Sequence, residues 1–308
     1  MIRKILYVVL VCLVVTEVTS AGEQWGIKDF FIYSKFSFSV NRDESFEIKN
    51  TRLCAEVERN NKFVVTGEFE AGEDSSLIVY KLSAGYKFYN WLRVTVGQFS
   101  NPIIFFDPTP DQKNFVYNPL SGYNPSKGDR GIGLSGKFLF NRHIGLKYNL
   151  CLFNGTGINR ADDNRKKDLV TYFSLVRPDT SFVLNWCRQA GRQPDGYRVA
   201  EHFYISFSPF KLAGLDHHNL KSLKLEAVSI RRSDLEESGY YLSGFYNISQ
   251  SSQLVARLHR LNQKEAIRLT LGANFFLLGG ALKLQPNIIV SKGLKPEWVG
   301  QCQVMLKF

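Results

Sequence analysis

The sequence predicts an all-β protein, a transmembrane antiparallel β-barrel of sixteen strands, and three observations support this prediction. Segments in which apolar and polar residues alternate recur from residue 29 to the end of the chain. Their length is about ten to thirteen residues, close to the roughly 9–11 with which a tilted strand crosses a bilayer. Turn-like stretches separate the segments, and we find no convincing amphipathic helix and no linker rich in serine and proline.

The first 21 residues are expected to be a signal peptide. Positive charge at Arg3 and Lys4 precedes a short apolar stretch, and the small residues of TSAG follow. This three-part layout is typical of secretory signal peptides, and the apolar stretch is short for a membrane span. An uncleaved anchor is the alternative. We therefore predict an exported protein with residues 1–21 as signal peptide and residues 22–308 as one barrel domain.

Sixteen strands are expected, in order along the chain. They cover residues 29–40, 46–58, 62–71, 76–88, 91–104, 130–140, 143–154, 167–177, 180–189, 199–208, 220–232, 238–248, 252–261, 265–277, 281–291 and 297–308.

The connections between these strands alternate in length. Those after even-numbered strands are mostly tight, whereas those after odd-numbered strands include the long segment 105–129 and the stretch AGRQPDGYR at 190–198. Short turns on one side and longer loops on the other are typical of bacterial outer-membrane barrels. We therefore predict location in the bacterial outer membrane. The connection PFKLAGLDHHN at 209–219 is longer than this pattern expects.

Alternation also assigns each strand an outward and an inward face. In LRVTVG, Leu92, Val94 and Val96 face outward, and Arg93 and Thr95 face inward. Aromatic residues gather near strand ends, as in YKFYNW at 86–91, which suits rings placed between lipid and water. A soluble β-sandwich is the alternative fold, but its strands would not need this length or these aromatic tips.

The last strand alternates up to the final residue of the chain. Phe308, Leu306 and Val304 lie on its apolar face. A closed barrel makes the last strand part of the wall, so the chain can end within it. A terminal aromatic with apolar residues two and four positions earlier also resembles the signal that the barrel-assembly machinery reads, so we expect this machinery as a partner.

The formal net charge is +11, which indicates anionic partners for an exported protein. The basic residues are spread along the whole chain, so nucleic acid is not expected as a partner. Four cysteines follow the signal peptide, at positions 54, 151, 187 and 302. They form no CxxC pattern, and we expect isolated thiols, without a metal or another cofactor.

Four stretches resemble the phosphate-selective porin O/P family. The resemblance is clearest in the second, which is similar to the family's GQFK-P strand, and in the fourth, which is similar to its NG-G, DN and KD segment. The stretches are FEIKNTRLCAEV (46–57), LRVTVGQFSNPI (92–103), GDRGIGLSGKF (128–138) and LCLFNGTGINRADDNRKKDLVTYFSLVRP (150–178).

The resemblance implies a sixteen-stranded, trimeric porin whose third outer loop, here 105–129, folds inward to narrow the lumen. It also implies that the family's arginine-rich anion constriction corresponds here to Lys49 and Arg52. Only part of that cationic set is present, and Ser100 replaces the usual lysine of GQFK. The resemblance therefore implies a general anion preference more firmly than selection of phosphate.

The charges on the inward faces favour the same conclusion. Choosing the polar face of a strand selects charged residues but does not select their sign. On these faces we count eleven cations and three acids. The cations are Lys35, Lys81, Lys87, Arg93, Lys137, Lys147, Lys224, Arg257, Arg268, Lys283 and Lys307, and the acids are Glu68, Glu70 and Glu226. Lysine and arginine rings are typical linings of anion pores. Basic residues that only solvate the lumen or bind acidic lipid headgroups are the alternative.

We therefore predict a porin with a water-filled, anion-preferring channel for small solutes, phosphate or polyphosphate among them. The expected ion pathway is Lys49, Arg52, Arg93, Lys113, Lys127, Lys137, Lys147, Arg257, Arg268 and Lys283, with the loop lysines Lys113 and Lys127 meeting Lys49, Arg52 and Arg93 near mid-height. Its other expected partners are outer-membrane lipid and, as a homotrimer, two copies of itself.

Two other functions remain open from the sequence alone: a pore-less structural or adhesion barrel, and a barrel enzyme. Enzymatic activity is not expected. His217 and His218 lie in a connection without neighbouring carboxylates at ligand spacing, and the chain contains no GxSxG motif.

Overall fold

The computed structural model describes most of the chain from residue 25 onward. The described residues are 25–40, 45–71, 77–102, 128–140, 143–157, 159, 166–179, 181–193, 196–209, 223–233, 237–261, 266–277, 282–292 and 297–307. The expected signal peptide, most of the expected inward loop 105–129, the connection 210–222 with its two histidines, and Phe308 lie outside these residues.

The described residues form sixteen strands, and within them no helix is long and apolar enough to cross a membrane. The strands are β1 (Trp25–Val40), β2 (Ser45–Arg59), β3 (Phe63–Ala71), β4 (Leu77–Tyr89), β5 (Leu92–Ser100), β6 (Gly128–Leu139), β7 (Gly145–Phe153), β8 (Asp168–Val176), β9 (Phe182–Gln193), β10 (Gly196–Phe207), β11 (Leu223–Arg232), β12 (Glu237–Ser249), β13 (Ser252–Leu261), β14 (Ala266–Leu277), β15 (Leu282–Lys292) and β16 (Glu297–Lys307).

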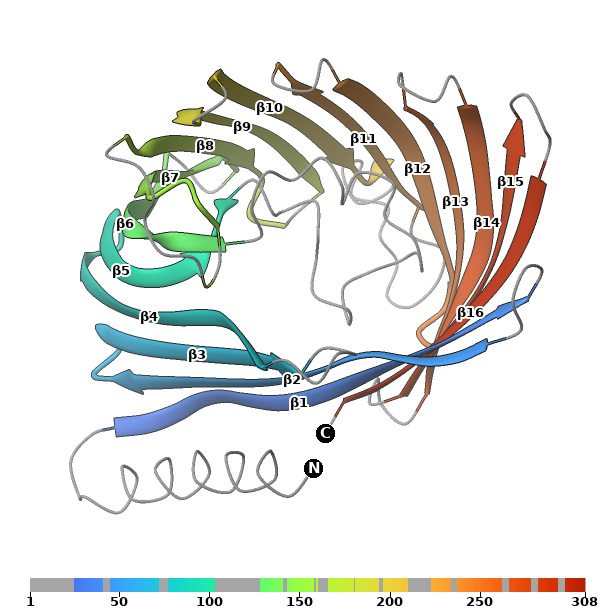
Figure 1. Ribbon diagram of the computed structural model, residues 1–308, viewed down its shortest axis with the longest axis horizontal. Coiled ribbons are helices and arrows are strands. Elements are labelled where there is room, and N and C mark those ends of the chain that lie inside the picture. Colours follow the sequence, from blue (N-terminus) through green and yellow to red (C-terminus); the bar gives the residue numbers. More distant parts are fainter. Residues whose placement is uncertain are drawn as a thin grey trace.

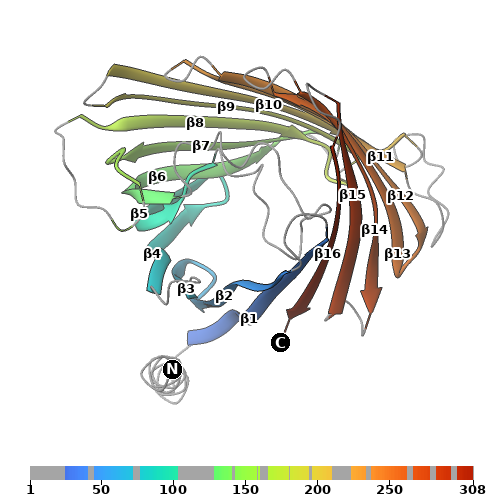
Figure 2. The ribbon, with the colours of Figure 1, turned by 45° about the vertical axis from the view of Figure 1, so that its right-hand side comes forward.

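Each strand pairs antiparallel with its neighbours in the sequence, and β1 pairs with β16, so the sheet closes into a barrel. Figure 1 shows the strands following one another around the wall in chain order. Figure 2 shows β16 beside β1, where Phe36 lies opposite Val304 and Ser34 opposite Leu306. The prediction of a transmembrane antiparallel barrel is confirmed.

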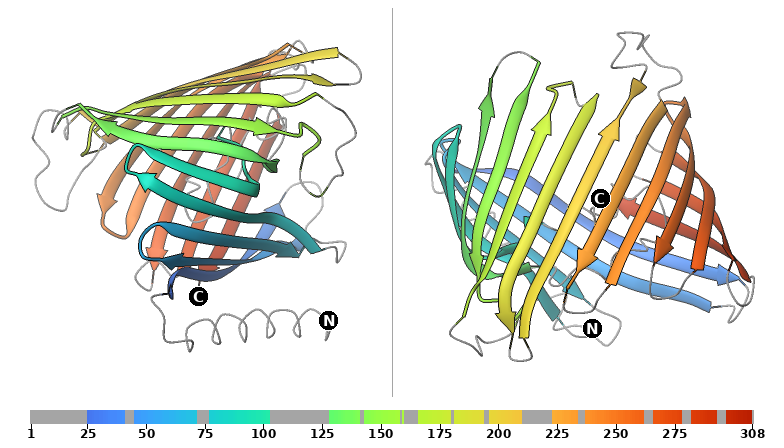
Figure 3. Two further views of the ribbon diagram at one scale, coloured as in Figure 1. Left: turned by 90° about the vertical axis from the view of Figure 1, so that its left-hand side faces the viewer. Right: turned by 90° about the horizontal axis from the view of Figure 1, so that it is seen from above.

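Several tight turns join neighbouring strands at one rim of the barrel, which can be followed in Figure 3. We call this rim the turn end. It contains the connections 60–62, 90–91 and 250–251, and Trp25 at the start of β1 lies there opposite Arg59. We call the opposite rim the loop end. The segment between β5 and β6 connects its strands at the loop end.

The strand boundaries agree with the sequence prediction to within a few residues, apart from the region around 190–198. A loop was expected there, from Ala190 to Arg198, because glycine, proline and aspartate cluster in it. That expectation is wrong: β9 continues to Gln193 and β10 begins at Gly196, so Pro194 and Asp195 form the whole connection. Proline and aspartate are favoured in tight turns as well as in loops, so the composition alone could not set the length.

The two faces of the wall alternate as predicted. On β8, Leu169 and Phe173 are exposed, whereas Val170, Tyr172 and Ser174 between them are buried. Residues opposite each other on paired strands point to the same side. The cross-strand pairs therefore extend this assignment to the other strands: one face is the exposed apolar exterior, and the other is the interior.

The exterior carries an aromatic belt at the turn end of β4 to β7. Tyr89 stacks on Trp91 at a ring distance of 5.2 Å, Trp91 on Phe138 at 6.3 Å, and Phe138 on Tyr148 at 5.8 Å. These rings follow the predicted YKFYNW stretch and suit the boundary between lipid and water. Tyr241, in contrast, is buried on the inner face.

Part of the interior wall is apolar. Cys151, Phe153, Val170, Tyr172 and Cys187 form a buried cluster across β7 to β9, with Phe99 packed against Phe153. Cys54, Cys151 and Cys187 are buried, and Cys302 is partly exposed. The cluster gives this side of the wall the packed inner surface on which the polar groups described next are held.

Candidate functional site: the inner face of the barrel

The predicted inward cations lie on the inner face wherever the structure describes their side chains. Lys87 lies opposite Arg93, and Lys137 lies opposite Lys147. The cations assigned to the inner face in this way are Lys81, Lys87, Arg93, Lys137, Lys147, Lys224, Arg257, Arg268 and Lys283.

A basic cavity of about 720 Å³ lies at the turn end of β2 to β7. Its charged lining consists of five cations and one acid: Lys62, Lys87, Arg93, Lys137 and Lys147 with Glu58. Tyr172 of β8 also lines it on the inner face, and Tyr89 and Tyr148 of the aromatic belt border it at the rim. The lysines are exposed, so their ammonium groups face the space of the cavity and can meet a solute there.

Local backbone features aim Arg93 into this cavity. The regular register of β4 and β5 places Lys87 opposite Arg93, and the register shifts only beyond this pair, where Tyr89 lies opposite Leu92. The Arg93 side chain then crosses β4 at Gly85, where a Cβ atom would lie 2.7 Å from a guanidinium nitrogen. Glycine at this position leaves the room that the guanidinium occupies. At the rim, the Tyr148 hydroxyl donates a hydrogen bond to the carbonyl of Trp91 at 2.6 Å and so connects β7 to the turn between β4 and β5.

The cations on the opposite wall, on β11 to β13, have close partners. The Lys224 Nζ atom lies 2.6 Å from a Glu226 carboxylate oxygen. The Arg257 Nε atom donates to the Ser243 hydroxyl at 3.1 Å, and the guanidinium lies 4.5 Å from the centre of the Tyr241 ring. Glu226 offsets the charge of Lys224, whereas neutral groups hold Arg257. The net positive charge of these three residues is therefore smaller than that of the basic cavity, and so is the field at the lumen.

Side-chain amides form a neutral ladder at the turn end of β12 to β15. Gln253 donates to Asn247 at 2.8 Å, Asn274 donates to Gln253 at 2.9 Å, and Gln285 donates to Asn274 at 2.7 Å. Asn274 and Gln285 are fully buried. We call these four residues the amide ladder. It connects four strands through hydrogen bonds without any net charge.

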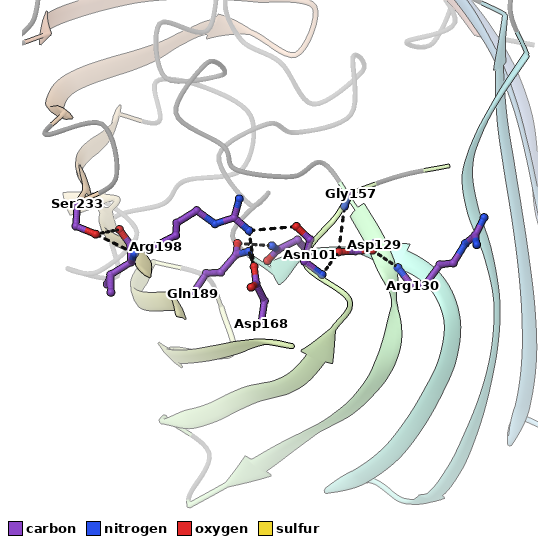
Figure 4. Close-up of polar contacts among 10 residues, drawn as sticks. Asn101, Asp129, Arg130, Gly157, Asp168, Gln189, Arg198 and Ser233 are labelled. Carbon is purple, nitrogen blue, oxygen red and sulfur yellow. Dashed lines mark hydrogen bonds and ion pairs between the residues drawn. The ribbon is translucent and has the colours of Figure 1, made fainter. Parts of the chain in front are cut away.

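A buried ionic network crosses β8 to β10 near the loop end, and we call it the Asp168 network (Figure 4). The Asp168 carboxylate, which has no exposed surface, accepts hydrogen bonds from the Gln189 amide and the Arg198 guanidinium. Gln189 in turn accepts a hydrogen bond from Asn101 at 2.8 Å. Asn101 directly follows β5, so the network fixes the point where the connection to β6 leaves the wall.

A second carboxylate holds the start of the connection between β7 and β8. Asp129 accepts hydrogen bonds from the backbone amides of Arg130, Gly155 and Gly157 at 2.7, 2.6 and 3.2 Å. Figure 4 shows its side chain directed at this turn, while the Arg130 side chain points away. Because Arg198 also donates to the carbonyl of Gly155 at 3.5 Å, the two carboxylates anchor the same connection.

Sequence reasoning missed these network residues as a functional group. Asp129 and Asp168 lie in stretches that resemble the porin family, but Arg198 was assigned to a loop. Gly191 is the available signal: a Cβ atom there would lie 1.6 Å from an Asp168 oxygen. A strand glycine marks a close approach of another group, but only the register shows which group approaches.

The expected grouping of Lys49, Arg52 and Arg93 at one level requires correction. Lys49 lies at a register shift between β1 and β2, and Arg52 lies in the middle of β2, opposite Tyr33 and Glu70. Arg93 is the second residue of β5 and shares the basic cavity with Glu58, near the turn end of β2. Arg93 therefore belongs to the turn end and not to a level shared with Arg52.

The remaining predicted residues divide into two groups. Lys113 and Lys127 lie outside the described residues, and so does Phe308. Val304 and Leu306 lie in β16, opposite Leu284 and Leu282 of β15. Their role in assembly stays a prediction. In the described part of the chain, no group of three or more histidine, cysteine, aspartate or glutamate residues could hold a metal ion.

Comparison with known proteins shows a likeness in structure. No family model and no curated protein matches the chain. Solved outer-membrane barrels do match, and the OmpT outer membrane protein of Vibrio cholerae without loop L8 has a TM-score of 0.61 at 10% identity, covering 93% of this chain and 100% of that one.

Two further solved structures match over similar lengths. A triple mutant of Rhodopseudomonas blastica porin has a TM-score of 0.60 at 11% identity, covering 92% of this chain and all of its own. OmpF of Salmonella typhi, in a complex with daunomycin, has a TM-score of 0.62 at 9% identity, covering 91% and 97%. At these identities the likeness shows the fold: this chain has the barrel architecture of outer-membrane porins.

Proposed function

We propose that this protein is a porin of the bacterial outer membrane that forms a water-filled diffusion channel and prefers small anions. Several of the solved structures that share its fold are described as porins or outer membrane proteins. One is described as a trimer form, OmpT of Vibrio cholerae, and this supports a homotrimer here. Inorganic phosphate and chloride are the first solutes to test.

The basic cavity is the observation that carries the anion preference. Five cations surround about 720 Å³ of space with one carboxylate in the lining. A conduit with low-dielectric walls focuses such a field and raises the local concentration of anions. Rings of lysine and arginine select anions in other pores by the same interaction.

The test is the reversal potential of single channels in a planar bilayer under a KCl gradient. We expect the wild-type protein to conduct with the sign of an anion-selective pore. The triple variant Lys87→Gln, Arg93→Gln, Lys147→Gln removes three charges from the basic cavity. Its reversal potential should move toward that of an unselective pore, because the field that concentrates chloride is reduced.

The matched control removes three cations from the outer face: Arg231→Gln, Arg260→Gln, Lys292→Gln. These residues lie opposite Glu201, Tyr240 and Ile267, on the exposed side of the wall. The control should keep the wild-type reversal potential. An unchanged potential in the cavity variant would contradict the anion preference. Absence of any conductance in the wild type would instead favour the pore-less barrel, and turnover of lipid or peptide by the protein would favour an enzyme.

A further inference from the structure

The basic cavity contains a row of inner-face residues on β4 to β8, five strands that lie side by side in Figure 2. Cross-strand pairing runs from Lys87 to Arg93 and then to Ser135, Asn149 and Tyr172. All five residues line the cavity. Neighbouring strands are spaced so that about 10 Å of wall separates Arg93 from Asn149, two strands apart. One small molecule can therefore contact the cations at one end of the row and the neutral polar groups beside them.

A second pair of cations lies beside the neutral part of this row. Lys137 and Lys147 lie opposite each other, two residues closer to the turn end than Ser135 and Asn149. Two residues correspond to roughly 7 Å along a strand. Positive charge therefore borders the serine and the asparagine on two sides, from Arg93 along the row and from the two lysines near the rim.

The side chains of this group are available to a ligand. Within the described part of the chain, neither its four cations nor its serine and asparagine side chains have an ion pair or a hydrogen bond. The opposite wall differs, because Lys224 contacts Glu226 there and Arg257 donates to Ser243. The polar groups of that wall bind one another, whereas those of the basic cavity face the space between them.

The cations suit the phosphate group of a ligand, and the neutral groups suit hydroxyls. A phosphate monoester carries about −1.5 to −2 charges near pH 7 and three strong acceptor oxygens, which bind well to lysine and arginine. A serine hydroxyl and an asparagine amide both donate and accept hydrogen bonds, as sugar hydroxyls do. Glu58, the acid in the lining, accepts hydrogen bonds and can take one from a hydroxyl.

The size and the rings of the cavity narrow the choice further. Its volume of about 720 Å³ is within the range of about 300–1,000 Å³ that is usual for small-molecule sites. A nucleotide would need a ring face on which its base could stack. Tyr172, the inner-face ring of the lining, is only 4% exposed and offers little such surface. A phosphorylated sugar uses the cations and the neutral groups without needing a ring.

We propose that the basic cavity binds phosphorylated sugars, with the phosphate held by the cations and the sugar hydroxyls by Ser135, Asn149 and Glu58. The inference rests on the proposed function, because the solute reaches the cavity through the channel. It names the class of anion that the cavity favours.

Calorimetric titration of the purified protein in detergent tests this at constant ionic strength. The probes are glucose 6-phosphate, inorganic phosphate and glucose. We expect glucose 6-phosphate to bind about tenfold more tightly than inorganic phosphate, as about two additional hydrogen bonds would give. Glucose alone should give no measurable binding, because it lacks the charge. Equal affinities for the two phosphates would overturn the proposal.

A double variant that changes no charge tests the neutral groups. Ser135→Ala with Asn149→Ala should bind inorganic phosphate as the wild type does and lose the preference for glucose 6-phosphate. The matched control, Thr171→Ala with Ser229→Ala, removes two polar side chains from the outer face, where they lie opposite Arg188 and Tyr240. It should keep the tenfold preference. A double variant that also keeps this preference would contradict the assignment of the neutral groups.

The reversal potential in a KCl gradient separates this inference from the channel itself. The double variant should keep the wild-type potential, because all its cations remain. An anion-selective wild type with equal affinities for the two phosphates would refute the sugar-phosphate site and leave the channel. A protein that prefers glucose 6-phosphate but does not conduct would refute the channel and support the site.

Discussion

The Asp168 network and the amide ladder are both buried hydrogen-bonded clusters on the inner face, but they differ in charge. The network joins β8 to β10 near the loop end through an ion pair whose side chains are 9% and 0% exposed. The ladder joins β12 to β15 at the turn end through neutral amides. The network also holds the connections that leave the wall, at Asn101 and Gly155, whereas the ladder only holds strands together.

In the channel that we propose, stability and conduction therefore depend on different groups. A buried ion pair is costly to break because the remaining partner stays charged and dry. Removing the partner of a buried neutral amide costs less free energy of unfolding, because the group that remains carries no charge. The basic cavity is a third case, in which four exposed lysines and the half-buried Arg93 line one space on the inner face. We expect its charges to add little to stability and much to selectivity.

The largest expected effect comes from breaking the ion pair of the network. Asp168→Leu leaves the Arg198 guanidinium buried without its carboxylate, and we expect the free energy of unfolding to fall by about 3–5 kcal/mol. Urea titration of the protein in lipid vesicles measures this. The double variant Asp168→Leu, Arg198→Leu should recover much of the loss. A double variant as unstable as the single one would show that the loss comes from packing and not from charge.

A smaller loss of stability is expected when Asn274, at the centre of the amide ladder, is replaced. Asn274 both donates to Gln253 and accepts from Gln285, so Asn274→Leu removes a partner of the fully buried Gln285 and of the half-buried Gln253. We expect a loss of about 2 kcal/mol in the same titration. The control Asn247→Leu removes only the last member and should cost about half as much. Equal losses at the two positions would mean that the ladder does not act as a connected unit.

The smallest effect on stability is expected for Arg93→Gln in the basic cavity. A surface-type substitution usually changes the free energy of unfolding by less than about 0.5 kcal/mol, and neighbouring Lys87 loses a repelling charge. Conduction should respond more strongly. One charge about 7 Å from a passing ion in water contributes about 0.6 kcal/mol, which is about threefold in anion conductance. Single-channel recording checks this, and unchanged conductance with a large loss of stability would reverse our assignment of roles.

Much of the fold could be predicted from the sequence because period-two alternation is a local property. The strand Ser252–Leu261 was predicted with its observed limits, and each neighbour differs by one or two residues. The inward faces of Lys87, Arg93, Lys137 and Lys147 followed from the same alternation.

The grouping of these side chains could not be predicted in the same way. Which inward residues meet depends on the register between strands, and bulges such as the one between Lys87 and Tyr89 change it without a clear sequence signal. The separation of Arg52 from Arg93 and the pairing of Asp168 with Arg198 both follow from register. The local alternation pattern specifies the side of the sheet to which a residue points, and the register between strands specifies which other residues lie next to it.

The closure of β1 on β16 has a consequence for how the protein is made. Tyr33 of β1 pairs with Lys307 of β16, and among the strand pairs that the structure describes this seam has the longest sequence separation. Contacts of this kind form late and slow the folding of a chain. Until the last strand arrives, the first strand keeps an open edge that can pair with any other extended segment. The closed barrel formed by the described strands has no such edge. While the barrel is incomplete, the open edge needs another protein to shield it from wrong pairing.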